Sequence, residues 1–103
     1  MDELKLFWTA TAEKQRDYIF EYWNQRNKSN SYSKKLNLAI RERTKILKKQ
    51  PEIGKEIQFK MLRLVSLKHY SIIYKLEKSA IIIVAFWDNR QDAKKLRDFL
   101  KKV

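Results

Sequence analysis

The sequence predicts an α+β fold, and three patterns lead to this prediction. Two stretches carry apolar residues at the three-to-four-residue spacing of amphipathic helices. From Ile57 onward the spacing changes to an alternation of two, which is typical of strands. Seven consecutive apolar residues, 81–87, then end abruptly in a polar cluster. A strand that is apolar on both faces must be covered on both faces, so we expect residues 81–87 to lie in the middle of the sheet.

The N-terminal part of the chain shows the pattern of a short strand followed by a helix. Apolar residues alternate with others over 4–8, as in a strand. Thr9 and Thr11 carry hydroxyls that can cap the following helix. From about residue 10 to residue 27 the apolar residues recur at helical spacing, so we expect one helix face to pack inward. The residues of this face are Ala12, Tyr18, Ile19, Tyr22 and Trp23.

A second helix is predicted from about Ser33 to Gln50. Pro51 ends it, because proline lacks an amide N–H and disfavours helix in the preceding residue. The polar connector 27–31 is short, so the two helices should form an antiparallel hairpin. One face of the second helix carries Tyr32, Leu36, Ala39, Ile40, Arg43, Ile46 and Leu47. A different face carries the basic residues Lys34, Arg41, Lys45 and Lys48.

Three strands and a final helix complete the chain. The strands are expected over 57–65, 69–76 and 80–87, and the short spacings between them imply an antiparallel meander. In the first of them Ile57, Phe59, Met61, Arg63 and Val65 share one face. Asp92 can cap a last helix with the apolar residues Leu96, Phe99, Leu100 and Val103. The predicted architecture is an N-terminal strand and an antiparallel helical hairpin packed on one face of an antiparallel sheet, with a short C-terminal helix.

The composition sets further bounds on the class of protein. A length of 103 residues predicts a single domain, 1–103. The absence of cysteine fits a reducing cytoplasm and excludes disulfides and thiolate metal sites. The first residues do not have the pattern of a signal peptide, and the apolar run 80–87 is too short for a membrane-spanning helix. No motif in the sequence predicts a metal or another cofactor.

The net charge of +12 is the strongest global indication of function, and it is unevenly distributed. Residues 1–30 carry five basic and five acidic side chains, whereas residues 31–75 carry twelve basic and three acidic ones. The middle of the chain therefore favours a polyanion or an acidic protein as partner, with a simply solvated face as the alternative.

The polar residues that follow the apolar run are the first candidate site. Asp88 and Arg90 come directly after the strand, where they can engage a partner or pair with each other to pin the loop. Basic residues on or beside the strands can surround an RNA phosphate; they are Lys60, Arg63, Lys68, Lys75 and Arg90. Tyr70, Tyr74 and Trp87 either offer faces for base stacking or belong to the core. His69, the only histidine, is either a general base or a solvated turn residue.

The order of these segments resembles the RelE/ParE superfamily of bacterial toxins from type II toxin–antitoxin modules. The segment 46–54, with its leucine, proline and glycine, is similar to the end of the family's second helix and the loop after it. Residues 63–65, 70–75 and 82–92 are similar to the last three strands and the closing motif. The resemblance covers nearly the whole chain. It implies a toxin that inhibits growth and is neutralised by a cognate antitoxin, for which an acidic protein would suit the +12 charge.

The superfamily implies one of two targets. RelE-like members cleave mRNA on the ribosome with basic residues and often a tyrosine or histidine; here the matching candidates are Arg90, Arg63, Lys60, His69 and Tyr70. ParE-like members inhibit DNA gyrase. The sequence departs from the RelE pattern at Ser71, where an arginine is frequent, and the last helix has no tyrosine. The ending 87–92 is more similar to the ParE type, so we favour gyrase binding, with mRNA cleavage second. A basic nucleic-acid-binding domain without toxicity is a third hypothesis.

Overall fold

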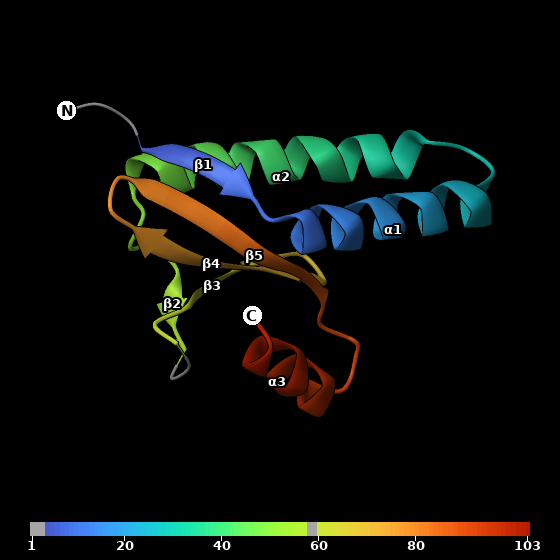
Figure 1. Cartoon of the computed structure of the whole chain (residues 1–103). Helices are drawn as coiled ribbons and strands as arrows, with labels where there is room; N and C mark the ends of the chain where they lie inside the picture. Colours follow the sequence, from blue (N-terminus) through green and yellow to red (C-terminus); the bar gives the residue numbers. More distant parts are fainter. Residues whose placement is uncertain (1–3, 58–59) are drawn as a thin grey trace.

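The computed structural model describes residues 4–57 and 60–103, and Figure 1 shows its elements. They follow the predicted order, with one additional short strand. The elements are β1 (Lys5–Trp8), α1 (Ala10–Asn27), α2 (Ser31–Lys49), β2 (Lys55–Glu56), β3 (Arg63–Leu67), β4 (Tyr70–Glu77), β5 (Ala80–Asp88) and α3 (Ala93–Lys101). The α+β fold class is therefore confirmed.

The strands form one five-stranded sheet in the order β1-β5-β4-β3-β2. β5 lies between the parallel β1 and the antiparallel β4, so the predicted central position of the apolar run is confirmed. β3 and β4 pair antiparallel, as the predicted meander requires. β1 is parallel to β5 because the helical hairpin carries the chain back along the sheet before the meander begins.

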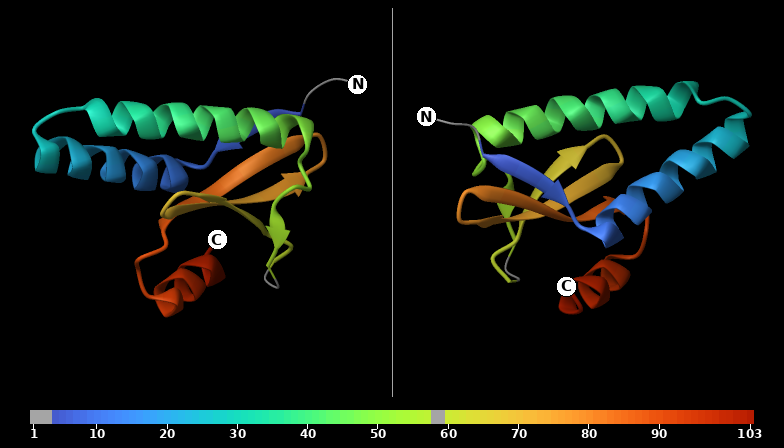
Figure 2. Two further views of the ribbon diagram at one scale, coloured as in Figure 1. Left: turned by 180° about the vertical axis from the view of Figure 1, so that it is seen from behind. Right: turned by 45° about the horizontal axis from the view of Figure 1, so that its top comes forward.

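Helices cover the two faces of the sheet unequally. The α1–α2 hairpin lies over one face and α3 lies on the other, as the views in Figure 2 show. The sheet has a separate hydrophobic core on each face, and side chains of β4 and β5 contribute to both. Tyr70, Ile72 and Phe86 pack in the larger core, beneath the hairpin. Ile73 and Val84 pack with Leu100 of α3 in the smaller one.

The start of α1 follows the sequence prediction, but part of its predicted inward face does not. Thr9 is the N-cap, and its hydroxyl oxygen accepts a hydrogen bond from the Ala12 N–H at 3.1 Å. Tyr18 and Tyr22, by contrast, are 73% and 47% exposed. Helical spacing does not separate the centre of an apolar stripe from its flank. Ala12 is at the centre, whereas the two tyrosines lie on the flank that faces the groove described below.

The predicted continuous strand over 57–65 is wrong. The chain makes a short hairpin there: β2 ends at Glu56, the Ile57 N–H donates to the Leu62 carbonyl at 3.0 Å, and β3 begins at Arg63. Lys60 and Met61 lie in the turn before β3, with φ values of 52° and 57°. Neither glycine nor proline marks this turn. The alternation of apolar residues therefore runs through it in the sequence and predicts a single strand. Phe59, which we placed on the strand face, lies outside the described residues.

Tyr74 of β4 fastens the connector between α2 and β2 to the sheet. Its side chain is fully buried. The Tyr74 hydroxyl donates a hydrogen bond to the Pro51 carbonyl at 2.7 Å and accepts one from the Gly54 N–H at 2.9 Å. The connector therefore has a defined course, although it contains little regular structure.

Candidate functional site

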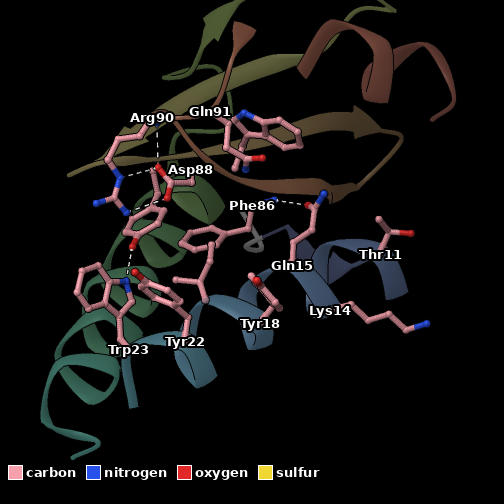
Figure 3. A pocket seen from close by; sticks show the side chains of 13 residues that line it. Thr11, Lys14, Gln15, Tyr18, Tyr22, Trp23, Phe86, Asp88, Arg90 and Gln91 are labelled. Carbon is pink, nitrogen blue, oxygen red and sulfur yellow. Dashed lines mark hydrogen bonds and ion pairs between the residues drawn. The ribbon is translucent and has the colours of Figure 1, made fainter. Parts of the chain in front are cut away.

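A groove of about 630 Å³ lies between α1 and the C-terminal end of β5. Figure 3 shows that α1 forms one wall of it and that the end of β5 with the following loop forms the other. The residues that line it are Thr11, Lys14, Gln15, Tyr18, Ile19, Tyr22, Trp23, Tyr70, Phe86, Trp87, Asp88, Arg90 and Gln91. Four of them, namely Tyr70, Trp87, Asp88 and Arg90, are residues that the sequence singled out.

Asp88 and Arg90 form a two-point ion pair at the end of the groove. The guanidinium Nε and one terminal nitrogen of Arg90 donate to the two carboxylate oxygens at 2.9 and 2.8 Å. The Arg90 backbone N–H donates to the same carboxylate at 2.9 Å. These hydrogen bonds hold the pKa of Asp88 below its usual range and raise the pKa of Arg90. The pair therefore remains charged across the physiological range and fixes the loop after β5.

Trp23 of α1 connects the ion pair to the buried part of the groove. Its indole N–H donates to the Tyr70 hydroxyl at 2.9 Å, and the Arg90 guanidinium lies 5.8 Å from the centre of its ring. The Tyr70 ring stacks on Phe86 with centroids 5.2 Å apart. Burial raises the pKa of Tyr70, so its hydroxyl remains protonated at neutral pH.

Gln15 shows why α1 lies close to this part of β5. The pairing of β1 with β5 ends at Trp8 opposite Ile83, so β1 offers no hydrogen-bond partner to the last residues of β5. The side-chain oxygen of Gln15 accepts the Phe86 N–H at 2.9 Å instead. A helix therefore replaces the neighbouring strand at this edge, and the groove forms where the strand is missing.

The other predicted strand residues are not gathered at this groove. The Arg63 guanidinium donates to the carbonyls of Glu52 at 3.1 Å and Gly54 at 2.8 Å, beside β2. The Lys60 ammonium donates to the carbonyls of Lys101 at 2.9 Å and Val103 at 2.7 Å. In the sheet, Arg63 is opposite Tyr74, whereas Asp88 is opposite Tyr70, the first residue of β4 and four residues before Tyr74. The predicted basic cluster is thus divided between two regions.

Three more predicted residues lie outside the groove. Lys68 and His69 are exposed in the turn between β3 and β4. The His69 carbonyl accepts the Asn89 N–H at 2.8 Å, which places this turn beside the loop after β5. Lys75 pairs with Glu77 at 3.5 Å.

The three aromatic residues predicted as core or stacking residues are all buried. Tyr70 and Tyr74 have no exposed surface. Trp87 is 8% exposed and stacks on Phe99 of α3, with ring centroids 5.7 Å apart. Rings in these positions are covered by protein on their faces, so they leave no room for a stacked base.

The basic residues of α2 form a separate surface. Lys34, Arg41 and Lys45 are exposed and Lys48 is half-buried, and none of the four lines the groove. Most of the groove residues that the sequence did not single out as functional come from α1, among them Lys14, Gln15, Tyr18, Tyr22 and Trp23. Three of them were assigned to the core, and only the tyrosine hydroxyls hinted that their rings lie at an edge.

The described residues contain no group of three histidine, cysteine, aspartate or glutamate side chains that could hold a metal ion. Among their helices, none is both long and apolar enough to cross a membrane.

The lowered pKa of Asp88 makes a prediction about stability. An acid with a lowered pKa in the folded state stabilises the fold above its unfolded pKa, near 4, and loses this contribution as the pH falls through the folded value. We expect Asp88→Asn to lower the free energy of unfolding at pH 7, because it removes the ionic partner of Arg90. The loss should be only about 1 kcal/mol, because the Arg90 side chain is 53% exposed. Urea unfolding at pH 7 and pH 2.5 measures this.

The difference between wild type and Asp88→Asn should be smaller at pH 2.5 than at pH 7. Asp17→Asn is a matched control, because Asp17 also pairs with a neighbouring arginine but is 63% exposed. Its effect should be smaller at pH 7. An equal loss from Asp88→Asn at both pH values would contradict the ionic origin of the effect.

Comparisons with known proteins place this geometry in a family. Residues 6–93 match the family model described as "ParE toxin of type II toxin-antitoxin system, parDE". Among solved structures, the chain is similar to one described as "Chromosomal ParDE TA system from P. aeruginosa", with a TM-score of 0.71 and 19% sequence identity. That alignment covers 84% of this chain and 96% of the other. A comparison with curated protein sequences gave no match.

The family match runs from the second residue of β1 to the first residue of α3 and thus includes the hairpin, nearly all of the sheet and the groove. It confirms the predicted resemblance and its ParE branch, and it does not favour the mRNA endonuclease or the non-toxic nucleic-acid-binding domain. The toxin–antitoxin context also supports the predicted cognate antitoxin as a partner. With residues 6–93 matched, this chain belongs to the ParE family of toxins from type II toxin–antitoxin systems.

Proposed function

We propose that this toxin inhibits growth by binding DNA gyrase, and that it does so without cleaving RNA. One observation carries the proposal: the basic side chains that an endonuclease would need around a phosphate are held apart. Arg63 and Lys60 donate to backbone carbonyls beside β2 and the C-terminus. Arg90 is bound to Asp88 at the other end of the sheet. Charge stabilisation at phosphorus requires such groups to converge on one point.

The residues that could transfer a proton also argue against RNA cleavage. Tyr70 has no exposed surface, and its hydroxyl already accepts the Trp23 N–H. Because burial raises its pKa, it is a poor general base at neutral pH. His69 is exposed in a turn, and Arg63 is not on that part of the sheet. These residues do not form the acid–base pair that RNA cleavage requires.

The groove suits a protein target better than a nucleotide. Tyr18 and Tyr22 are exposed at its rim, and Arg90 lies at its end. Tyrosine and arginine are enriched among the residues that contribute most to protein–protein affinity. We therefore propose the groove as the surface that contacts the target, with an acidic antitoxin competing for the toxin. The proposal places the protein in the cytoplasm, where DNA is supercoiled.

Two assays with the purified toxin distinguish the possible targets. One follows supercoiling of relaxed plasmid by gyrase, and the other follows the length of an mRNA during translation in vitro. We expect supercoiling to fail at toxin concentrations that leave the translated mRNA intact. Cleavage of the mRNA with normal supercoiling would overturn the proposal.

Arg90→Ala tests the groove. We expect at least a tenfold loss of gyrase inhibition, equivalent to about 1.4 kcal/mol of binding free energy. The loss of stability should be about 1 kcal/mol, as for Asp88→Asn, because the same ion pair is broken. Arg97→Ala on the exposed surface of α3 is the matched control and should keep full inhibition. Circular dichroism and urea unfolding confirm that both variants fold. Full inhibition by Arg90→Ala would show that this residue does not belong to the surface that contacts gyrase.

A further inference from the structure

The outer face of α2 carries a row of positive charge that the groove does not use. We call Lys34, Arg41, Lys45 and Lys48 the basic stripe. Their spacings of seven, four and three residues place them on one side of the helix. The opposite side carries Leu36, Ile40 and Leu47, which are buried against the sheet. The stripe therefore faces away from the core along most of the length of α2, which lies at the outer edge of the molecule in Figure 1.

The stripe lacks the acidic partners that some basic residues have in the part of the chain that the structure describes. Arg16, Arg63, Lys75 and Arg90 each form an ion pair with an acidic side chain. Across the described ranges, no ion pair joins any stripe residue to a carboxylate. α2 contains a single acidic residue, Glu42. Positive charge is thus concentrated on this face without compensation from the protein itself.

We propose that the basic stripe binds the phosphate backbone of duplex DNA without reading its sequence. Lys34 and Lys48 are fourteen residues apart, which corresponds to about 21 Å along a helix. One strand of B-DNA carries about six phosphates over this length. Because both strands of the duplex carry phosphates, four cations in a line along a rigid helix can each lie near a phosphate of the duplex backbone.

The chemistry of the stripe favours duplex DNA over the other polyanions. The exposed large apolar residues of α2 are Leu38, which is 61% exposed, and Ile46, which is 42% exposed, and neither is aromatic. Protein interfaces need buried apolar and aromatic anchors, and lysine is depleted in them. Single-stranded nucleic acids are held by stacking on exposed aromatic rings. The exposed tyrosines Tyr18 and Tyr22 belong to α1, not to the stripe.

The inference goes beyond the proposed function, because it concerns a second surface and does not require gyrase. The groove is formed by α1 and the end of β5, and none of the stripe residues lines it. A toxin with both surfaces can contact a protein through the groove while α2 lies on DNA held by that protein. Binding of this kind raises the overall affinity without any new contact at the groove.

The test measures DNA binding by the toxin alone. Fluorescence polarisation with a labelled 20-base-pair duplex is recorded from 50 to 200 mM salt. We expect the logarithm of the association constant to fall with the logarithm of salt concentration with a slope of about −3.6, the value for four phosphate contacts. The variant K34Q/R41Q/K45Q/K48Q should bind at least tenfold more weakly at 50 mM salt, with a slope near zero.

A second variant controls for net charge. K94Q/K95Q/R97Q/K101Q removes the same charge from the exposed surface of α3 and should keep the wild-type affinity and slope. Circular dichroism verifies the folding of both variants. Equal weakening by the two variants would show an effect of net charge alone and would overturn the proposal. So would the absence of duplex binding at 50 mM salt, or tighter binding to single-stranded RNA or DNA.

Two further outcomes separate this inference from the proposed function. If the stripe variant binds the cognate antitoxin more weakly but keeps its DNA affinity, the partner of the stripe is a protein and the inference is wrong. If wild-type toxin shows stripe-dependent DNA binding but does not inhibit gyrase, the inference about the stripe is supported and the proposal that gyrase is the target is wrong.

Discussion

Replacing Phe86 with alanine is expected to lower the free energy of unfolding by about 3–5 kcal/mol. Phe86 is 1% exposed and belongs to the larger core. Its ring stacks on Tyr70 at 5.2 Å and lies 6.3 Å from the ring of Trp8. These two partners come from two different strands, β4 and β1, so they cannot easily move together to fill the cavity. A loss of this size is a large part of the total stability of a small domain, which is about 5–15 kcal/mol.

Phe7→Ala is the matched control for Phe86→Ala. Phe7 lies on the neighbouring β1 but is 51% exposed, so its removal should cost about 1 kcal/mol or less. Urea unfolding of the two variants and the wild type gives both values. Similar losses would show that the core collapses around position 86. Gyrase inhibition should be compared only where Phe86→Ala is folded, because Phe86 also lines the groove.

The central position of β5 could be predicted from the sequence because burial leaves a simple signature. A strand covered on both faces has no position for polar side chains, and residues 81–87 have none. The boundaries of α1 were equally accessible, because Thr9 provides a local cap. Information of this kind is local, so it is visible without the tertiary structure.

The turn at Lys60 and Met61 could not be predicted from the sequence in the same way. Both residues adopt positive φ angles, which are usually indicated by glycine or asparagine. The hairpin forms here because Leu62 is buried and because β2 pairs with β3. These are tertiary effects, and they override the local preference of the two residues.

The candidate site was only half predictable for a related reason. Asp88 and Arg90 follow the buried strand directly, so their position at its end could be inferred. Arg63 is on a strand of the same sheet, but its guanidinium turns to the carbonyls of the connector before β2. The contribution of α1 depends on Gln15 meeting the edge of β5 that β1 leaves unpaired. No pattern in the amino-acid sequence predicts the contacts of Arg63 and Gln15.

Replacing Gly54 with alanine is expected to lower the free energy of unfolding by about 2–4 kcal/mol. A Cβ atom at this position would lie 2.5 Å from the Tyr74 hydroxyl oxygen and 2.8 Å from a carbon of its ring. The Tyr74 side chain is fully buried and hydrogen-bonded to Pro51, so it cannot move aside without breaking that bond. The glycine is required here because of this close approach, since its φ angle is not positive.

A double-mutant cycle with Tyr74→Phe tests this explanation. Tyr74→Phe alone should cost about 1–3 kcal/mol, because it leaves the Gly54 N–H and the Pro51 carbonyl without their partner. In the phenylalanine background the shortest contact of the new Cβ is absent and the ring is free to shift. Gly54→Ala should then cost at least 1 kcal/mol less than in the wild type, a coupling typical of residues in contact. Additive losses in urea unfolding would mean that the cost of Gly54→Ala arises in the connector itself and not from its contact with Tyr74.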